Sequence, residues 1–198
     1  MNIVPSRKAA MTRAMPLYLM IKPPLAARQA LLGCVSANAI DGHDGAEKYH
    51  CTMLKLGESQ AWSDDMLDRF CRWMALFEAE PFRVFLDQLD GNLPRESRRQ
   101  VAPAAFQRSL ARFVARCGFP LPVHNFWLHL TLAYRAGSDR KAVIAPISWL
   151  VDEIILVRSV HGVGHDQLAR WPLRKRQLEL PFCCASPRVP FGTNQARG

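Results

Sequence analysis

Two short stretches of the sequence carry a histidine and a threonine with one residue between them. The first is YHCTMLKLG, with His50 and Thr52, and the second is LHLTLAY, with His129 and Thr131. Both stretches are otherwise apolar and strand-like, and the side chains of a strand alternate between its two faces. Each histidine is therefore expected to share a face with its threonine. Because roughly 0.1 such pairs would arise by chance in this composition, the repeat indicates a common chemical role.

The neighbouring residues complete this pattern. Cys51 and Met53 are expected to point to the opposite face of the first strand, as are Leu130 and Leu132 in the second. Each strand would then bury one apolar face and present an imidazole beside a hydroxyl on the other.

An imidazole is the side chain best suited to exchange a proton near neutral pH. Two histidines that face one groove can divide this work, one accepting a proton from the nucleophile and the other donating a proton to the leaving oxygen. The threonine hydroxyls can donate hydrogen bonds to a phosphate held between them. These residue types favour displacement at phosphorus without a metal ion, with His50, Thr52, His129 and Thr131 as the candidate catalytic residues.

Two other interpretations of the motifs stay open. Each His-x-Thr pair could be the solvent-exposed polar face of a strand. Alternatively, His50 and His129 could bind a metal ion. A catalytic zinc ion usually needs three protein ligands, and no flanking His, Asp or Glu supplies an obvious third. We therefore expect neither a metal ion nor another cofactor.

The other four histidines are weaker candidates. His124 precedes His129 by five residues and would face the other way on a continued strand. His161 and His165 are four apart, but the stretch HGVGH contains too much glycine for a helix, and His43 lies in a loop-like segment. We expect surface or loop roles for all four, although a loop over a cleft can still touch a substrate.

The elements that must position the motifs follow from apolar periodicity and capping signals. Strands are expected at 17–22, 49–56, 82–89, 126–134, 147–150 and 153–159, with a last one inside RWPLRKRQLEL. Helices are expected at 25–37, after a cap at Ser63, and from Pro103 to Cys117. One apolar helical stripe, expected to pack in the core, consists of Met66, Phe70, Trp73 and Phe77. Strands and helices intermix without a regular βαβ rhythm, which predicts an α+β fold with largely antiparallel sheets.

The charge of the chain bears on its partners. The 26 Lys and Arg exceed the 17 Asp and Glu, which gives a formal net charge of +9. Such an excess attracts polyanions and favours RNA, DNA or nucleotides as partners, the alternative being a soluble basic protein without that role. The stretch GNLPRESRRQ holds Arg95, Arg98 and Arg99. We interpret it as a solvated loop, with phosphate binding as the alternative.

The cysteines and the hydropathy of the chain bear on its cellular compartment and on its domain organisation. The 6 Cys show no CxxC pair, which favours free thiols, a reducing compartment and a cytoplasmic protein. No apolar run approaches the length that spans a bilayer. We expect a basic leader at 1–14, one domain at 15–181, a loose tail at 182–198, and a monomer.

The two motifs resemble those of the 2H phosphoesterase superfamily, and specifically of the 2′-5′ RNA ligase family, also called RNA 2′,3′-cyclic phosphodiesterases. Its first motif often reads HLTLxFLG, which HCTMLKLG matches at His50, Thr52, Leu56 and Gly57. Its second reads HLTLAR or similar, which HLTLAYR matches through Ala133. The resemblance covers about residues 15–180 and includes the late EIILVRS stretch and the WPL near the end.

This resemblance implies a two-lobed α+β fold, with helices on the outside, in which each lobe gives one motif strand to a central groove. It also implies a substrate, RNA or a small nucleotide, that ends in a 2′,3′-cyclic phosphate. By similarity, His50 would protonate the departing 3′-oxygen, His129 would activate water, and Thr52 and Thr131 would hold the phosphate oxygens, leaving a 2′-phosphate. The reverse reaction in the same groove would account for 2′-5′ ligation.

The sequence departs from the family pattern at two points. Lys55 stands where the family usually has an aromatic residue. Tyr134 occupies the usual arginine position after the second motif, with Arg135 shifted by one. We expect Tyr134 and Arg135 to contact the substrate, and the shift bears on which substrate is used more than on the chemistry. Two rival functions remain: an RNA-binding protein that keeps the groove without turnover, and a metal-dependent hydrolase that chelators would inhibit.

Overall fold

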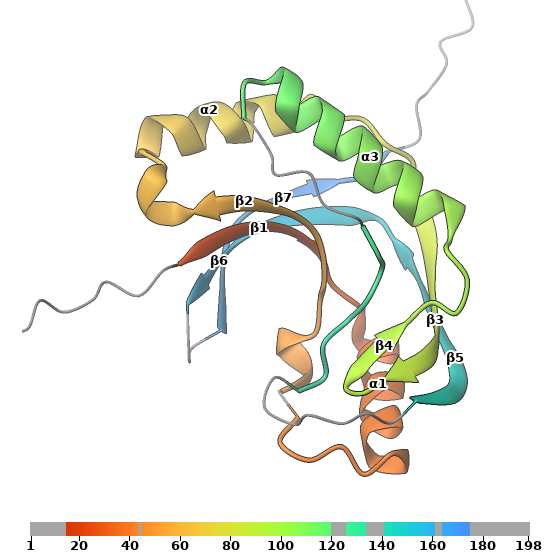
Figure 1. Cartoon of the computed structure of the whole chain (residues 1–198). Helices are drawn as coiled ribbons and strands as arrows, with labels where there is room; N and C mark the ends of the chain where they lie inside the picture. The colour runs from red at the N-terminus through yellow and green to blue at the C-terminus, as the bar shows by residue number, and fades with distance from the viewer. Residues whose placement is uncertain (1–14, 44, 120–125, 134–140, 161–163, 175–198) are drawn as a thin grey trace, which may run out of the picture.

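The structure is a computed structural model of the chain that describes residues 15–43, 45–119, 126–133, 141–160 and 164–174. Within these residues the chain forms three α-helices, two 3₁₀-helices and seven strands, and the strands make two antiparallel sheets (Figure 1). The expected leader at 1–14 and tail at 182–198 lie outside the described residues.

The first sheet has four strands in the order β2-β1-β6-β7, and every neighbouring pair is antiparallel. Its strands are β1 (Pro16–Ile21), β2 (Cys51–Glu58), β6 (Glu153–Val160) and β7 (Gly164–Pro172). β1 carries apolar residues on both of its faces, because each face packs in a buried cluster. Leu17, Leu19 and Ile21 are fully buried in the main core, whereas Met20 packs in a smaller cluster on the other face.

The second sheet has three strands in the order β4-β3-β5. Its strands are β3 (Phe82–Asp90), β4 (Leu93–Arg95) and β5 (Lys141–Val151). β3 and β4 form a hairpin whose turn contains Gly91 at φ +64°, a conformation that glycine adopts without steric cost. β5 is longer than predicted, because it pairs with β3 from the Phe82–Val151 pair to the Asp90–Lys141 pair.

Three helices cover the sheets, namely α1 (Leu25–Ala37), α2 (Asp64–Met74) and α3 (Val101–Arg116). α1 has the predicted bounds. The predicted cap of α2 is confirmed, since the backbone N–H of Met66 donates to Ser63 Oγ at 3.2 Å. α3 begins two residues before Pro103, because the first turn of a helix tolerates proline. The α+β fold class with antiparallel sheets is confirmed.

The buried face of α2 differs from the predicted stripe. Phe70, Met74 and Phe77 are buried and Met66 packs against them, but the side chain of Trp73 is 43% exposed. Consecutive residues of a helix are about 100° apart around its axis, so the burial of Met74 turns Trp73 toward solvent. The prediction for Trp73 is therefore wrong. Among the described residues, no helix is both long and apolar enough to cross a lipid bilayer.

Candidate functional site

The first motif lies at the start of an edge strand of the four-stranded sheet. β2 begins at Cys51, two residues later than predicted, so His50 immediately precedes the strand. Its Nδ1 lies 2.7 Å from the carbonyl oxygen of Lys48, in the short 3₁₀-helix η1 (Ala46–Lys48). Because a carbonyl can only accept a hydrogen bond, Nδ1 must carry a proton. Nε2 of His50 is therefore the nitrogen that gains or loses a proton in any catalytic step.

Within β2, the predicted division of the first motif into two faces is confirmed for residues 51–53. Cys51 and Met53 are fully buried in the main core, whereas Thr52 is half-buried and pairs with Met20 on the other face of the sheet. The β1–β2 ladder contains two register shifts, one of them next to Thr52. Such bulges bend a strand and redirect its side chains. Burial raises the pKa of the Cys51 thiol, so this neighbour of His50 stays an uncharged core residue.

A third histidine contacts the first motif. His165, near the start of β7, packs its ring at right angles to that of His50, with the two centroids 4.4 Å apart. Burial, followed by the nearby His50, Lys22 and Lys48, lowers the pKa of His165 from 6.5 to about 4. The expectation of a surface or loop role for His165 is wrong. The sequence placed it in a glycine-rich stretch, and only the β6–β7 pairing brings it onto a strand.

The second motif differs from its prediction in regularity. Residues 126–133 form an extended segment with a single isolated bridge between Arg95 and His129, and not the strand that was expected there. The backbone N–H groups of Leu130 and Leu132 donate to the carbonyls of Pro94 and Asn92, each at 2.9 Å. β4 is only three residues long, so its ladder with this segment is short.

The alternation of faces in the second motif is nevertheless as predicted. Leu128, Leu130 and Leu132 are buried, whereas His129 is exposed and Thr131 is half-buried. Nδ1 of His129 lies 2.9 Å from the carbonyl oxygen of Trp127 and so carries a proton. Both motif histidines are thus oriented in the same way, by the carbonyl two residues before them.

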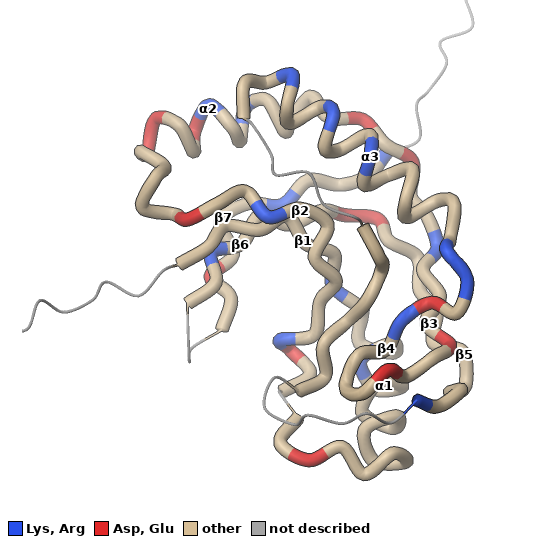
Figure 2. The backbone as a smooth tube through the Cα atoms, viewed as in Figure 1, with Lys and Arg blue, Asp and Glu red and all other residues tan. Residues whose placement is uncertain are grey.

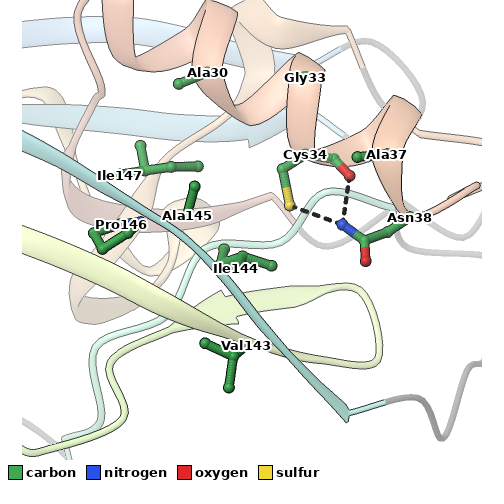
Figure 3. Close-up of a pocket in the computed structure, with 10 residues that line it drawn as sticks. All are labelled: Ala30, Gly33, Cys34, Ala37, Asn38, Val143, Ile144, Ala145, Pro146 and Ile147. Atoms are coloured by element: carbon green, nitrogen blue, oxygen red, sulfur yellow. Dashed lines mark hydrogen bonds between the residues drawn. The ribbon is translucent and has the colours of Figure 1, made fainter.

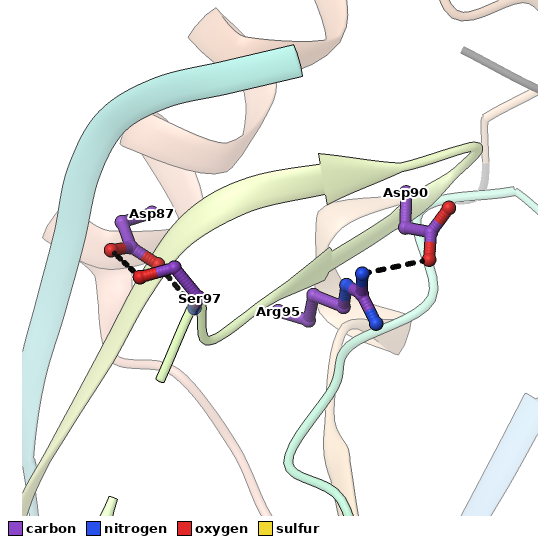
Figure 4. Close-up of polar contacts among 4 residues, drawn as sticks. All are labelled: Asp87, Asp90, Arg95 and Ser97. Atoms are coloured by element: carbon purple, nitrogen blue, oxygen red, sulfur yellow. Dashed lines mark hydrogen bonds and ion pairs between the residues drawn. The ribbon is translucent and has the colours of Figure 1, made fainter. Parts of the chain in front are cut away.

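A guanidinium group accompanies the second motif. Arg95 of β4 is the bridge partner of His129, and the Leu130–Pro94 hydrogen bond makes the two a closely spaced, non-hydrogen-bonded pair with side chains on one face. Its guanidinium forms an ion pair with Asp90 at 3.1 Å (Figure 4) and lies over the ring of Trp127, with Cζ 5.6 Å from the centroid. The interpretation of Arg95 as part of a solvated loop is therefore wrong.

A second carboxylate of β3 fixes the end of β4. Asp87 accepts hydrogen bonds from the backbone N–H of Ser97 at 2.7 Å and from its hydroxyl at 2.5 Å (Figure 4). The ion pair of Asp90 thus holds Arg95 itself, and the bonds of Asp87 hold the chain two residues after it. Figure 2 shows further basic residues on the stretch from β4 to α3 and along α3 itself.

The two motifs share a core but have different polar neighbours. Their apolar sides, which include Cys51, Met53 and Leu130, belong to one cluster of buried residues. On the polar sides, His50 contacts His165, whereas His129 is grouped with Arg95 and Trp127. The other two predicted site residues, Tyr134 and Arg135, lie outside the described residues.

Sequence reasoning missed Trp127, His165 and the position of Arg95. A usable signal existed only for Trp127, which lies two residues before His129 and must share its face in an extended segment. The contacts of the other two depend on pairing between distant segments. In the described part of the chain, no three His, Cys, Asp or Glu residues are grouped as a metal ion would require.

A pocket elsewhere in the molecule has a different character. It lies between α1 and β5, has a volume of about 520 Å³, and is lined mainly by small and apolar side chains (Figure 3). Asn38 Nδ2 donates to the carbonyl oxygen of Cys34 at 2.9 Å and lies 3.5 Å from its sulfur. Burial raises the pKa of the Cys34 thiol, which makes it a poor nucleophile. The motif residues do not line this pocket.

Of the comparisons with known proteins, only the comparison with solved structures finds matches. No protein-family model matches the sequence, and no curated protein matches it significantly. The crystal structure of Escherichia coli LigT complexed with 3′-AMP aligns with a TM-score of 0.65 at 20% identity, over 82% of this chain and 99% of LigT. TT0787 of Thermus thermophilus aligns with a TM-score of 0.62 at 20% identity, over 82% of this chain and 100% of TT0787.

A third match, a crystal structure described as a phosphoesterase, has a TM-score of 0.65 at 20% identity and covers 82% of this chain and 99% of its own. All three alignments cover nearly the whole of the known protein and most of this chain. The expected resemblance to the 2′-5′ RNA ligase family is thus confirmed as a shared fold, and this chain has the fold of LigT.

Proposed function

We propose that this protein is a metal-independent phosphodiesterase that opens the 2′,3′-cyclic phosphate ends of RNA or nucleotides to 2′-phosphates. The observation that carries the proposal is the matched geometry of the two motifs on a LigT fold. In each motif a carbonyl accepts the Nδ1 proton of the histidine, so that Nε2 is the nitrogen available for proton transfer. Two histidines prepared in this way suit one proton acceptor and one proton donor.

In the proposed reaction, Nε2 of His129 accepts a proton from a water molecule as its oxygen attacks phosphorus. The bond between phosphorus and the 3′-oxygen breaks, and Nε2–H of His50 donates its proton to that oxygen. Thr52 and Thr131 donate hydrogen bonds to the non-bridging oxygens, where negative charge increases in the transition state. The product carries a 2′-phosphate and a 3′-hydroxyl. With a 5′-hydroxyl in place of water, the same step joins two RNA ends through a 2′-5′ linkage.

The surroundings of the motifs support the assignment of roles. The general base must meet water, and His129 is exposed. The general acid must deliver its proton to the leaving oxygen and not to solvent, and His50 is only 8% exposed. Arg95 places a cation beside His129, where it can bind a phosphate oxygen of the substrate.

Features outside the motifs favour a nucleotide or RNA substrate. Trp127 shares the face of His129 and is 48% exposed, so its indole can stack against a nucleobase while Arg95 lies over the ring. The net charge of +9 favours polyanions. LigT itself has been crystallised with 3′-AMP, with ATP and with NADP+.

The test offers an RNA oligonucleotide with a 2′,3′-cyclic phosphate end to the wild type, His50→Ala and His129→Ala, in excess EDTA. His43→Ala, a change at an exposed histidine in the segment before η1, is the control. We expect chelator-resistant conversion to the 2′-phosphate, with a rate that falls about 10²–10⁴-fold in both motif variants and is unchanged in the control.

Two outcomes would overturn the proposal. Inhibition by EDTA would indicate a metal-dependent hydrolase. Folded wild-type protein that binds the RNA without converting it would indicate an RNA-binding protein that keeps the groove but lacks turnover.

A further inference from the structure

The rings of His165 and His50 are in contact, although the strand pairings place the two residues near opposite ends of β1. His165 pairs with Ser159, one step beyond the Leu17–Arg158 pair at the beginning of β1. His50 precedes Cys51, which pairs with Ile21 at the end of β1. In a flat sheet the two levels, six residues apart along β1, would be separated by about 20 Å along the strands.

The curvature of the sheet closes this distance. β1 and β6 are drawn as strong arcs in Figure 1, and the ladders on both sides contain register shifts, including one between Leu156 and Val157. Bulges increase the bend and twist of a sheet. As a result, the rings of His50 and His165 meet at 4.4 Å, edge to face. This contact therefore depends on the shape of the whole sheet.

The charged groups around this pair come from several elements. Lys22 follows β1, and its Nζ donates to the carbonyl oxygen of Glu47 at 3.4 Å. The Lys48 side chain lies beside the start of β7, with Cε 3.8 Å from the position of a Cβ on Gly164. Both lysines act on His165, while Arg28 of α1 and Glu47 act on Lys22 with opposite signs. His165 therefore stays uncharged at neutral pH beside the imidazole of His50.

His165 also buries a polar atom that has no partner. Within the described residues, its Nδ1 is inaccessible to solvent and makes no hydrogen bond. An unpaired buried polar atom lowers the stability of the folded protein, a cost that phenylalanine at this position would avoid. A histidine that contacts the candidate general acid at such a cost calls for a functional reason.

On the basis of the function proposed above, we propose that His165 is a positioning residue for His50. Its uncharged ring holds the His50 imidazole in one orientation and shields it from water, so that the proton on Nε2 is directed to the leaving oxygen. It adds no positive charge that would compete with the proton of His50. His165 itself exchanges no proton in the reaction.

The test compares His165→Ala, which removes the ring, with His165→Phe, which keeps the edge contact but cannot titrate. Gln167→Ala, an exposed position two residues further along β7, is the control. We expect kcat to fall about tenfold in His165→Ala with KM nearly unchanged, since a small misplacement of a catalytic group is costly. His165→Phe should recover most of the loss at pH 7, and the control should match the wild type.

A second measurement is independent of turnover. The His50 ring signals in proton NMR spectra, assigned with His50→Ala, are followed against pH in each variant. We expect the titration midpoint of His50 to move by about half a unit in His165→Ala and by less in His165→Phe. A role confined to stability would lower the melting temperature without changing this midpoint.

Each result has a distinct meaning. If the wild type turns over and His165→Ala has the same kcat, pH profile and His50 midpoint, the positioning role is overturned while the proposed function stands. If no substrate is turned over but the midpoint moves as expected, the proposed function fails and the control of His50 by His165 stands. An unchanged midpoint without turnover would overturn both.

Discussion

The two His-x-Thr segments orient their histidines in the same way but are held in the fold by different strand pairings. In both, the histidine Nδ1 bonds to the carbonyl two residues earlier, at 2.7 Å for His50 and 2.9 Å for His129. The first segment continues into the eight residues of β2, whereas the second is held to β4 by an isolated bridge. The orientation of each imidazole is therefore set locally, and its surroundings are set by the sheet that it joins.

The difference in surroundings supports the proposed division of the chemistry between the two segments. His50 is buried against His165 and close to two lysines, where a proton is shielded from solvent. His129 is exposed and lies beside Arg95 and Trp127, where water, a phosphate and a nucleobase can approach. A nearly repeated motif can thus supply an acid on one side and a base on the other, because environment decides the role of a titratable group.

The largest effect should come from a substrate that needs no general acid. With a deoxynucleoside 3′-(p-nitrophenyl phosphate), the leaving p-nitrophenolate departs without a proton. We expect His50→Ala to lose about 10³-fold in kcat on a 2′,3′-cyclic phosphate but at most about tenfold on this ester, while His129→Ala loses activity on both. Steady-state rates of product release measure the difference. Equal losses of both variants on the ester would contradict the division into acid and base.

A smaller effect should distinguish the exposed tryptophan of the second segment from one elsewhere. Trp127→Leu should weaken the binding of 3′-AMP about tenfold, since stacking on a base contributes about 1–3 kcal/mol. Binding of ribose 5-phosphate, which lacks the base, should be unchanged. The matched control is Trp73→Leu on α2, a tryptophan of similar exposure. Calorimetric titration measures both ligands, and equal weakening in the two variants would rule out a specific base contact.

The smallest effect concerns stability, and it should arise at the first segment. The pKa of His165 is about 4 in the folded protein and near 6.5 when unfolded, so between these values the unfolded chain binds the extra proton. Folding stability should therefore decrease as pH falls from 7 to 5. The ring is partly exposed, so we expect a contribution of about 1–2 kcal/mol.

Urea unfolding at pH 7 and pH 5 measures this dependence. His165→Phe should lose less stability between the two values than the wild type, because it has no group to protonate. His43→Phe, at an exposed loop position, should behave like the wild type. Parallel pH dependence in all three proteins would show that His165 does not couple folding to pH.

The sequence-based predictions were correct where a feature depends on neighbouring residues and wrong where it depends on a distant part of the chain. The bounds of α1 and the Ser63 cap were correct, because they depend on neighbouring residues. The burial of Leu130 and the exposure of His129 were also correct, because alternation is a local property. Regular strand structure around His129 was wrong, since a strand needs a partner and β4 is too short to supply one along the whole segment.

The sequence by itself determined which side chains could do chemistry and which face of each segment they occupy. Residue type and the two-residue repeat of an extended chain suffice for that. Only the tertiary structure decided which residues lie beside them. The curved sheet brought His165 to His50, and the β3–β4 hairpin brought Arg95 to His129. These contacts join segments distant in sequence, and they depend on pairing register and sheet curvature, which a local pattern does not encode.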